Sequence, residues 1–181
     1  MSGFMPNPEL EKRGIFFAFA IDLQKEIKMP SLPTKQRFQS WIASALSSES
    51  VMSVITEYLP FVPNKKNILR MTIRLVDEAE SSSLNEAYRQ KKGPTNVLSF
   101  PFETFNDQKT LYLGDLVICA PLMQVEALNQ KKEVMDHYAH IAIHGFLHLL
   151  GFDHIESEEA EQMELIEANV LAQLSIANPY I

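Results

Sequence analysis

The sequence predicts a single-domain protein of the α/β (α+β) class, and three observations lead to this prediction. Short segments with alternating apolar residues are typical of half-buried strands. Longer segments between them carry apolar residues at helical spacing, and 181 residues suit one well-packed domain better than two. Strands interleaved with helices form layered folds of this class. We expect the domain to span residues 15–181, and residues 1–14, which lack periodicity, to be a flexible extension.

The first part of the chain predicts one strand followed by one helix. Apolar residues alternate over residues 17–23, as they do in a half-buried strand. Thr34 can cap a helix whose apolar stripe includes Phe38 and Trp41. Residues 47–67, which are rich in serine and contain two prolines, are interpreted mostly as a connection.

The middle of the chain predicts a second strand, a helix and a short third strand. Residues 68–76 alternate between apolar and polar side chains. Asp77 and Glu80 then resemble a capping box, which opens a helix. Residues 97–100 follow a glycine–proline turn and are expected to form the short strand.

The last part of the chain predicts a fourth strand at residues 113–120 and three helices after it. The first of these helices begins near Pro121. The second spans about residues 132–150; its second half is apolar nearly all round, which predicts burial, and Gly151 can end it. The third begins near Ser157, and its glutamates are expected to form a solvated face: Glu158, Glu159, Glu161, Glu164 and Glu167.

Composition and charge limit the classes of function. No stretch approaches the roughly eighteen apolar residues that a membrane span needs. A net charge of −7 argues against a generally basic nucleic-acid-binding surface, so any contact with nucleic acid should be local. Cys119 is the single cysteine, which rules out an internal disulfide and favours a cytoplasmic protein.

Three histidines near the end of the long predicted helix have the spacing of a metal site. His144 and His148 lie four residues apart on one helical face, and a turn at Gly151 brings His154 after them. The spacing H-x-x-x-H-x-x-G-x-x-H is that of metzincin metalloproteases. Three neutral imidazoles leave a zinc-type ion its full charge and one open position for chemistry. We therefore predict that these histidines bind one Zn²⁺ ion per chain.

Gly145 separates the chain from those proteases. The residue after the first ligand should be a glutamate, which acts as the general base. Glycine cannot accept a proton, so we do not expect peptide hydrolysis by that mechanism. His137 and His140, on the same predicted helix, are interpreted as structural residues. Asp153 either orients a ligand or precedes the last helix.

A second unusual segment places Arg89, Lys91 and Lys92 just before a rigid turn and a short strand. The fork of an arginine matches phosphate oxygens, and lysines add positive charge. Taken alone, such cations are more typical of a solvated surface.

Taken together, these segments resemble the YbeY family of bacterial endoribonucleases, also called rRNA maturation factors. The zinc motif of the family, H-G-x-L-H-L-x-G-[YF]-D-H, matches residues 144–154. A second motif, R-x-K-x-x-P-T-[DN]-V-L-S-F-P, matches residues 89–101, and residues 113–118 resemble the L-G-D-[IL]-V-I strand of the family. The resemblance covers roughly residues 15–175.

The resemblance implies a mixed four-stranded sheet with about five helices and the zinc-ligand helix in a cleft. It implies zinc-dependent cleavage of single-stranded RNA in 16S ribosomal RNA 3′-end maturation and in ribosome quality control. The expected partners are ribosomal RNA, the small ribosomal subunit and assembly factors, in the bacterial cytoplasm. By the same resemblance, His144, His148 and His154 are the metal ligands, and Arg89 is the functional arginine near the metal.

Some features stay open at this point. Metal-bound hydroxide, Asp153 and the RNA 2′-hydroxyl are all candidates for the general base, and neither the native metal nor the oligomeric state is set by the sequence. A different zinc hydrolase is a rival function, although Gly145 argues against a peptidase. The main alternative is a non-catalytic assembly factor that uses zinc structurally, which three ligands and an open position disfavour.

Overall fold

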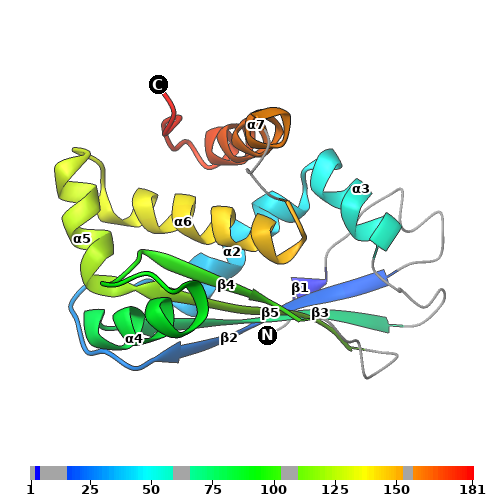
Figure 1. The fold of residues 1–181 in the computed structure, drawn as a ribbon. Coiled ribbons are helices and arrows are strands. Elements are labelled where there is room, and N and C mark those ends of the chain that lie inside the picture. The colour runs from blue at the N-terminus through cyan, green and yellow to red at the C-terminus, as the bar shows by residue number, and fades with distance from the viewer. Residues whose placement is uncertain (1–2, 5–15, 59–65, 103–109, 153–156) are drawn as a thin grey trace.

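One mixed sheet runs through the protein, with helices on both of its faces (Figure 1). The structure is a computed structural model, and it describes residues 3–4, 16–58, 66–102, 110–152 and 157–181. The strand order is β1-β2-β3-β5-β4. The strands are β1 (Gly3–Phe4), β2 (Phe16–Lys25), β3 (Lys66–Val76), β4 (Val97–Pro101) and β5 (Thr110–Cys119).

The direction of the strands makes the sheet mixed. β2, β3 and β5 are parallel, whereas β4 pairs antiparallel with β5 at one edge. These four strands confirm the predicted mixed four-stranded sheet. The two-residue β1 pairs antiparallel with β2 at the other edge, and the rest of the segment predicted as a flexible extension lies outside the described residues.

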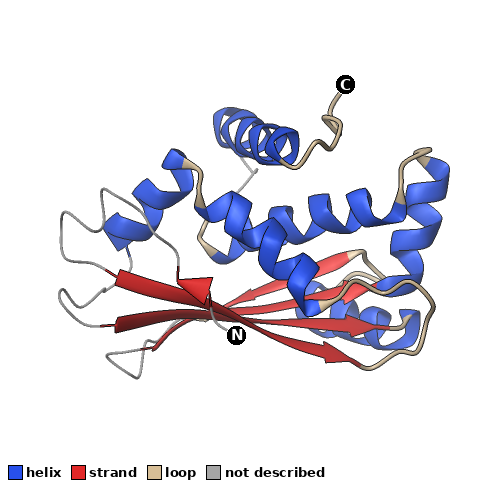
Figure 2. Cartoon of the chain, turned by 180° about the vertical axis from the view of Figure 1, so that it is seen from behind, coloured by secondary structure: helices blue, strands red, loops and turns tan. Residues whose placement is uncertain are grey.

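The helices are distributed unequally over the two faces. α2 (Lys35–Leu46) and α6 (Val134–Leu149) pack on one face, with α3 (Glu49–Tyr58) beside α2 and α7 (Ser157–Gln173) across α6 (Figures 1 and 2). α4 (Glu78–Arg89) packs on the opposite face, and α5 (Ala120–Asn129) joins β5 to α6. Across these described residues, no helix combines the length and the apolar character that a membrane span needs.

Local sequence signals fix where several helices begin and end. The side chain of Thr34 accepts a hydrogen bond from the backbone N–H of Arg37 and caps α2. Asp77 accepts one from the backbone N–H of Glu80 at 2.8 Å and caps α4. Gly151 follows α6 with a φ of +89°, a conformation that glycine adopts at little cost. These predicted helix boundaries are confirmed.

The interpretation of residues 47–67 as a connection is wrong for its first half, which forms α3. Val51, Met52 and Ile55 are buried on one side of this helix. Their helical spacing outweighs the serines around them, because burial of an apolar stripe contributes more than the weak helix propensity of serine costs. With α3 included, the described residues form six helices, where about five were expected.

The main core lies between the sheet and the layer of α2 and α6. On β3, Leu69, Met71, Ile73 and Leu75 are fully buried on this side, as the alternation predicts. The second half of α6 is enclosed between the sheet and α7, which explains its apolar composition. Packing on two sides fixes the rotation of α6, and thereby the direction of its remaining polar stripe.

Candidate metal site

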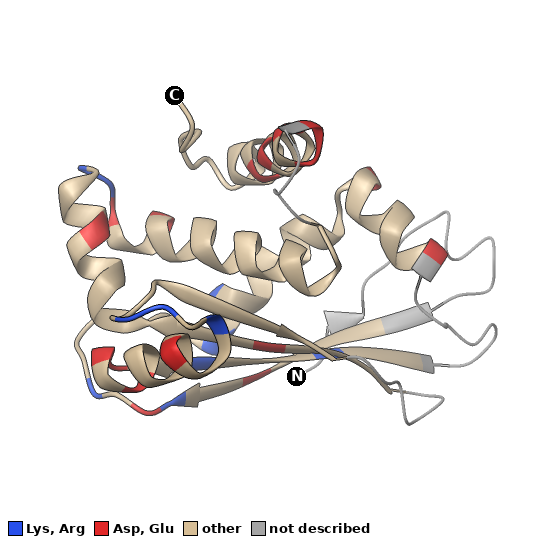
Figure 3. Cartoon of the chain, in the orientation of Figure 1, with Lys and Arg blue, Asp and Glu red and all other residues tan. Residues whose placement is uncertain are grey.

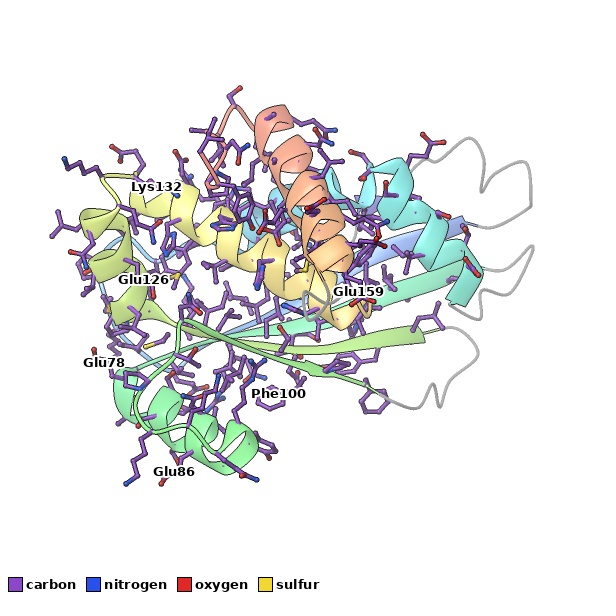
Figure 4. The ribbon with its side chains drawn as sticks, turned by 45° about the horizontal axis from the view of Figure 1, so that its top comes forward. Glu78, Glu86, Phe100, Glu126, Lys132 and Glu159 are labelled. Carbon is purple, nitrogen blue, oxygen red and sulfur yellow. The ribbon has the colours of Figure 1, made fainter. Side chains whose placement is uncertain are left out.

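The polar stripe of α6 consists of histidines. His140, His144 and His148 follow one another at intervals of one turn, and each is partly exposed while their apolar neighbours are buried. Residues four apart on a helix point the same way. Because α7 crosses α6 on this side (Figure 4), the histidines lie between the two helices.

His144 and His148 are placed as two ligands of one metal ion would be. Their Nε2 atoms lie 3.2 Å apart, and their rings are nearly perpendicular, with an interplanar angle of 83°. Two nitrogens bound to one tetrahedral zinc ion, at Zn–N distances of about 2.0–2.1 Å, are themselves about 3.3 Å apart. The spacing and the imidazole chemistry of this pair therefore fit a zinc ion.

The third predicted ligand, His154, lies outside the described residues, as does Asp153. Within the part of the chain that the structure describes, no cluster of three or more histidine, cysteine, aspartate or glutamate side chains is arranged to hold a metal ion. The complete three-histidine site therefore stays a prediction, of which the structure places two members.

Glu167 of α7 stands behind the histidine pair and is fully buried. Its Oε1 atom accepts a hydrogen bond from Nδ1 of His144 at 2.8 Å. Its Oε2 atom accepts one from Nε2 of His140 at 3.2 Å and another from the hydroxyl of Tyr180. The expectation that Glu167 belongs to a solvated face is wrong.

The electrostatics of Glu167 favour its ionised form. Burial alone would raise the pKa of this carboxyl, but hydrogen bonds from His140 and His144, together with the charge of His144 and the Tyr180 hydroxyl, lower the pKa to about 2. Glu167 is therefore a buried carboxylate that accepts hydrogen bonds from three sides.

A second carboxylate–histidine pair involves His137, which lies about one helical turn before His140 in α6. The Nε2 atom of His137 lies 2.7 Å from Oε2 of Glu126, and the amide of Asn96 donates to the same oxygen at 3.3 Å. The hydrogen bond from His137 lowers the pKa of Glu126, more than burial raises it. His137 is 2% exposed, which agrees with its structural interpretation.

These residues line a cavity of about 610 Å³ beside the histidine stripe. Its walls include His140, Lys132 and Pro179, and in Figure 4 Lys132 and Glu126 lie at the start of α6 and on α5. The cavity therefore adjoins the candidate metal site along α6.

Gly145 faces the sheet, on the side of α6 away from the histidine stripe. A Cβ atom at this position would lie 2.9 Å from Cδ2 of Leu116 and 3.3 Å from Cγ2 of Val97. Its carbonyl oxygen accepts a hydrogen bond from the hydroxyl of Ser99 on β4 at 3.3 Å. The position at which proteases carry their general base is thus occupied by close packing.

Arg89 is the last residue of α4, on the face of the sheet opposite α6. Its side chain is exposed, and with Lys91 and Lys92 it gives the basic segment that is blue between α4 and β4 in Figure 3. The described contacts do not join Arg89 to His144 or His148. Both helices do touch β4, which forms the edge of the sheet between them.

Sequence reasoning missed two members of this arrangement, Glu167 and Tyr180. A signal for Glu167 was present: it lies four residues after Met163 and three before Val170, both buried, so it falls within the apolar stripe of α7. Tyr180 carried no comparable signal, because it follows the last helix without periodicity.

Comparisons with known proteins identify the family and agree with the fold. Residues 24–175 match the model of the family described as Endoribonuclease YbeY. An Endoribonuclease YbeY of Coxiella burnetii is 45% identical over 161 residues, covering 89% of this chain and 97% of that protein. Another, of Colwellia psychrerythraea, is 46% identical over 164 residues, covering 91% and 98%.

A Thermotoga maritima protein of known solution structure shares the fold, with a TM-score of 0.50 and 19% identity over 86% of this chain and 92% of that one. The fold likeness agrees with the layered mixed sheet, and the sequence matches extend over most of the chain. The chain therefore belongs to the YbeY family of endoribonucleases.

Proposed function

We propose that the protein is a zinc-dependent endoribonuclease specific for single-stranded RNA. The observation that carries the proposal is the way the two predicted functional segments meet on adjacent residues of β4. The hydroxyl of Ser99 donates a hydrogen bond to the carbonyl oxygen of Gly145, the residue next to His144. The ring of Phe100 lies 5.0 Å from that of Tyr88, next to Arg89. A single-stranded RNA that passes over the edge of the sheet at β4 would thus contact both segments.

Each group has a distinct part in the proposed reaction. The zinc ion would be bound by His144, His148 and His154. When bound, it stabilises negative charge on the phosphoryl group. Arg89 would bind the same phosphate through its planar fork and stabilise the charge that develops on it. The exposed basic segment with Lys91 and Lys92 supplies the local phosphate contact that an acidic protein needs.

The cavity beside α6 supports an RNA substrate. Its volume of about 610 Å³ is within the usual range for small-ligand sites, and it is lined by donors and acceptors such as Asn96, Lys132 and His140. Unpaired bases expose the edges that such groups recognise, whereas bases in a duplex do not. This difference favours single-stranded over double-stranded RNA.

We further propose that the substrate is ribosomal RNA, with roles in 16S rRNA 3′-end maturation and ribosome quality control in the cytoplasm. The small ribosomal subunit and its assembly factors would then be the partners. Membership of the YbeY family is the support for this assignment.

A cleavage assay tests the enzymatic proposal. Zinc-loaded wild-type protein should cut a single-stranded RNA and leave the same RNA uncut when it is annealed to its complement. His144→Ala and Arg89→Ala should each reduce the rate by about a hundredfold or more. Arg37→Ala, which removes an exposed arginine from α2, should cleave like the wild type.

The pattern of outcomes separates the explanations. Equal cleavage by all four proteins would show that a contaminating nuclease is responsible. Mapping the product ends identifies the nucleophile, since attack by the RNA 2′-hydroxyl gives a cyclic phosphate and attack by water does not.

A non-catalytic assembly factor is the alternative. A cell-based test uses Arg89→Ala protein that still binds zinc, which metal analysis verifies. Full restoration of ribosome maturation by this variant, together with absent cleavage in vitro, would favour the assembly factor. A peptidase is disfavoured by Gly145, because its packing against Leu116 leaves no space for a general base.

A further inference from the structure

A buried carboxylate sets the orientation of one predicted metal ligand. Oε1 of Glu167 lies 2.8 Å from Nδ1 of His144, and Glu167 has no exposed surface. An ionised carboxylate can only accept hydrogen bonds, so Nδ1 of His144 must carry the hydrogen. The other ring nitrogen, Nε2, points toward His148, whose Nε2 atom is 3.2 Å away. The contact with Glu167 thereby uses Nδ1 and turns Nε2 toward His148, where a metal ion would bind it.

The carboxylate of Glu167 is itself fixed by hydrogen bonds to its second oxygen. Oε2 of Glu167 accepts hydrogen bonds from His140 and from the hydroxyl of Tyr180. The Tyr180 ring also packs edge-on against His140, with centroids 5.8 Å apart. Tyr180 belongs to the segment after α7, so residues at the end of the chain contact the group that orients His144.

We propose that Glu167 is a positioning residue of the metal site, which fixes the tautomer and ring orientation of His144, and that Tyr180 holds Glu167 in place. This inference rests on the proposed metal site, and it adds α7 and the C-terminal segment to that site. A carboxylate behind a metal-binding histidine raises the basicity of the ligand and removes its rotational freedom. Loss of such a partner typically weakens metal binding about 10- to 100-fold.

Zinc affinity, measured on the full-length protein by competition with a chromophoric chelator, tests the proposal without RNA. Glu167→Gln keeps the shape but removes the charge, and it should weaken zinc binding about 10- to 100-fold. Tyr180→Phe should weaken it by a smaller factor, because His140 still contacts Glu167.

The chain offers matched controls for this measurement. Glu126→Gln removes the carboxylate that pairs with His137, another histidine of α6, and Glu164→Gln removes an exposed carboxylate from α7. Both should keep zinc affinity within about twofold of the wild type. Equal weakening by Glu126→Gln and Glu167→Gln would assign the effect to general destabilisation and overturn the proposal.

The tautomer of His144 gives a second readout that does not depend on any variant folding. Nitrogen-15 NMR of the histidine rings in the metal-free wild-type protein should show a hydrogen on Nδ1 of His144. A hydrogen on Nε2 in its place would overturn the proposal. Unchanged zinc affinity in Glu167→Gln, with RNA cleavage by the wild type intact, would overturn this inference alone. Tight zinc binding without cleavage would overturn the proposed function alone.

Discussion

The Cβ position of Gly145 lies 2.9 Å from Cδ2 of Leu116, so α6 approaches β5 closely at the residue after the first predicted ligand. Leu116 is fully buried, and its methyl groups have little room to move. The glycine that distinguishes this chain from the metalloproteases thus has a packing role. It lets the histidine helix lie close to the sheet.

Gly145→Ala should therefore destabilise the protein although alanine is the better helix former. Overpacking lowers the free energy of unfolding by about 1–3 kcal/mol, and the better helix propensity of alanine raises it by about 1 kcal/mol. We expect a net loss of up to about 2 kcal/mol in the free energy of unfolding, measured by urea denaturation. Gly145→Glu should lose more and acquire no peptidase activity. A Gly145→Ala protein more stable than the wild type would show that Leu116 moves aside freely.

Much of the architecture follows from periodicity in the sequence. Alternation on β3 and the caps at Thr34 and Asp77 predicted elements that the structure confirms. α3 was missed because serines obscured a short apolar stripe. Composition is a weaker signal than spacing where a short helix packs on one side only.

The candidate site could be predicted only in part. Local spacing placed His144 and His148 together, because both lie on one helix. The contact of Glu167 with His144 joins residues 23 positions apart, and no local pattern encodes it. A glutamate in a helix with many glutamates looks solvated unless its place in the apolar stripe is noticed.

A second prediction concerns Gly114, which has a φ of +133° where β5 is irregular. A Cβ atom there would collide with the carbonyl oxygen of Phe100 on β4. Gly114→Ala should therefore cost about 3 kcal/mol or more, since both the backbone and the β4–β5 pairing must shift.

Gly93→Ala is the matched control for Gly114→Ala. Gly93 also has a positive φ, of +88°, but nothing lies within 4 Å of its Cβ position. The free energy of unfolding of this variant should fall only by the cost of placing alanine at a positive φ, which is about 1–2 kcal/mol. Equal losses in the two variants, measured by thermal and urea denaturation, would refute the steric argument for Gly114.

The third prediction is that zinc stabilises the folded protein through the histidine pair. A ligand that binds the folded state alone adds about 2.7 kcal/mol at a hundred times its dissociation constant. Zinc should raise the melting temperature of the wild type, and a chelator should reverse the rise. His148→Ala should abolish most of the shift, whereas Glu126→Gln should retain it. A shift of equal size in His148→Ala would place the zinc elsewhere.

The fourth prediction uses Tyr112 on the sheet face opposite α6. Burial raises the pKa of this phenol to about 12, and a hydrogen bond to Asp115 at 2.5 Å acts in the same direction. In the unfolded chain a tyrosine has a pKa of about 10. Because the folded pKa is the higher one, the stabilising contribution is complete below pH 10 and is lost as the pH rises toward 12.

The free energy of unfolding of the wild type should therefore fall between pH 10 and pH 12. In the Tyr112→Phe variant this free energy should fall less steeply over the same interval. Urea denaturation at three pH values in this range gives the two slopes. Tyr88→Phe, which removes a phenol from a side chain that is 68% exposed, should keep the wild-type slope. Burial also raises the pKa values of Tyr138 and Tyr180, so part of the fall should persist in Tyr112→Phe. Identical slopes for Tyr112→Phe and the wild type would contradict the assigned role of the Tyr112–Asp115 contact.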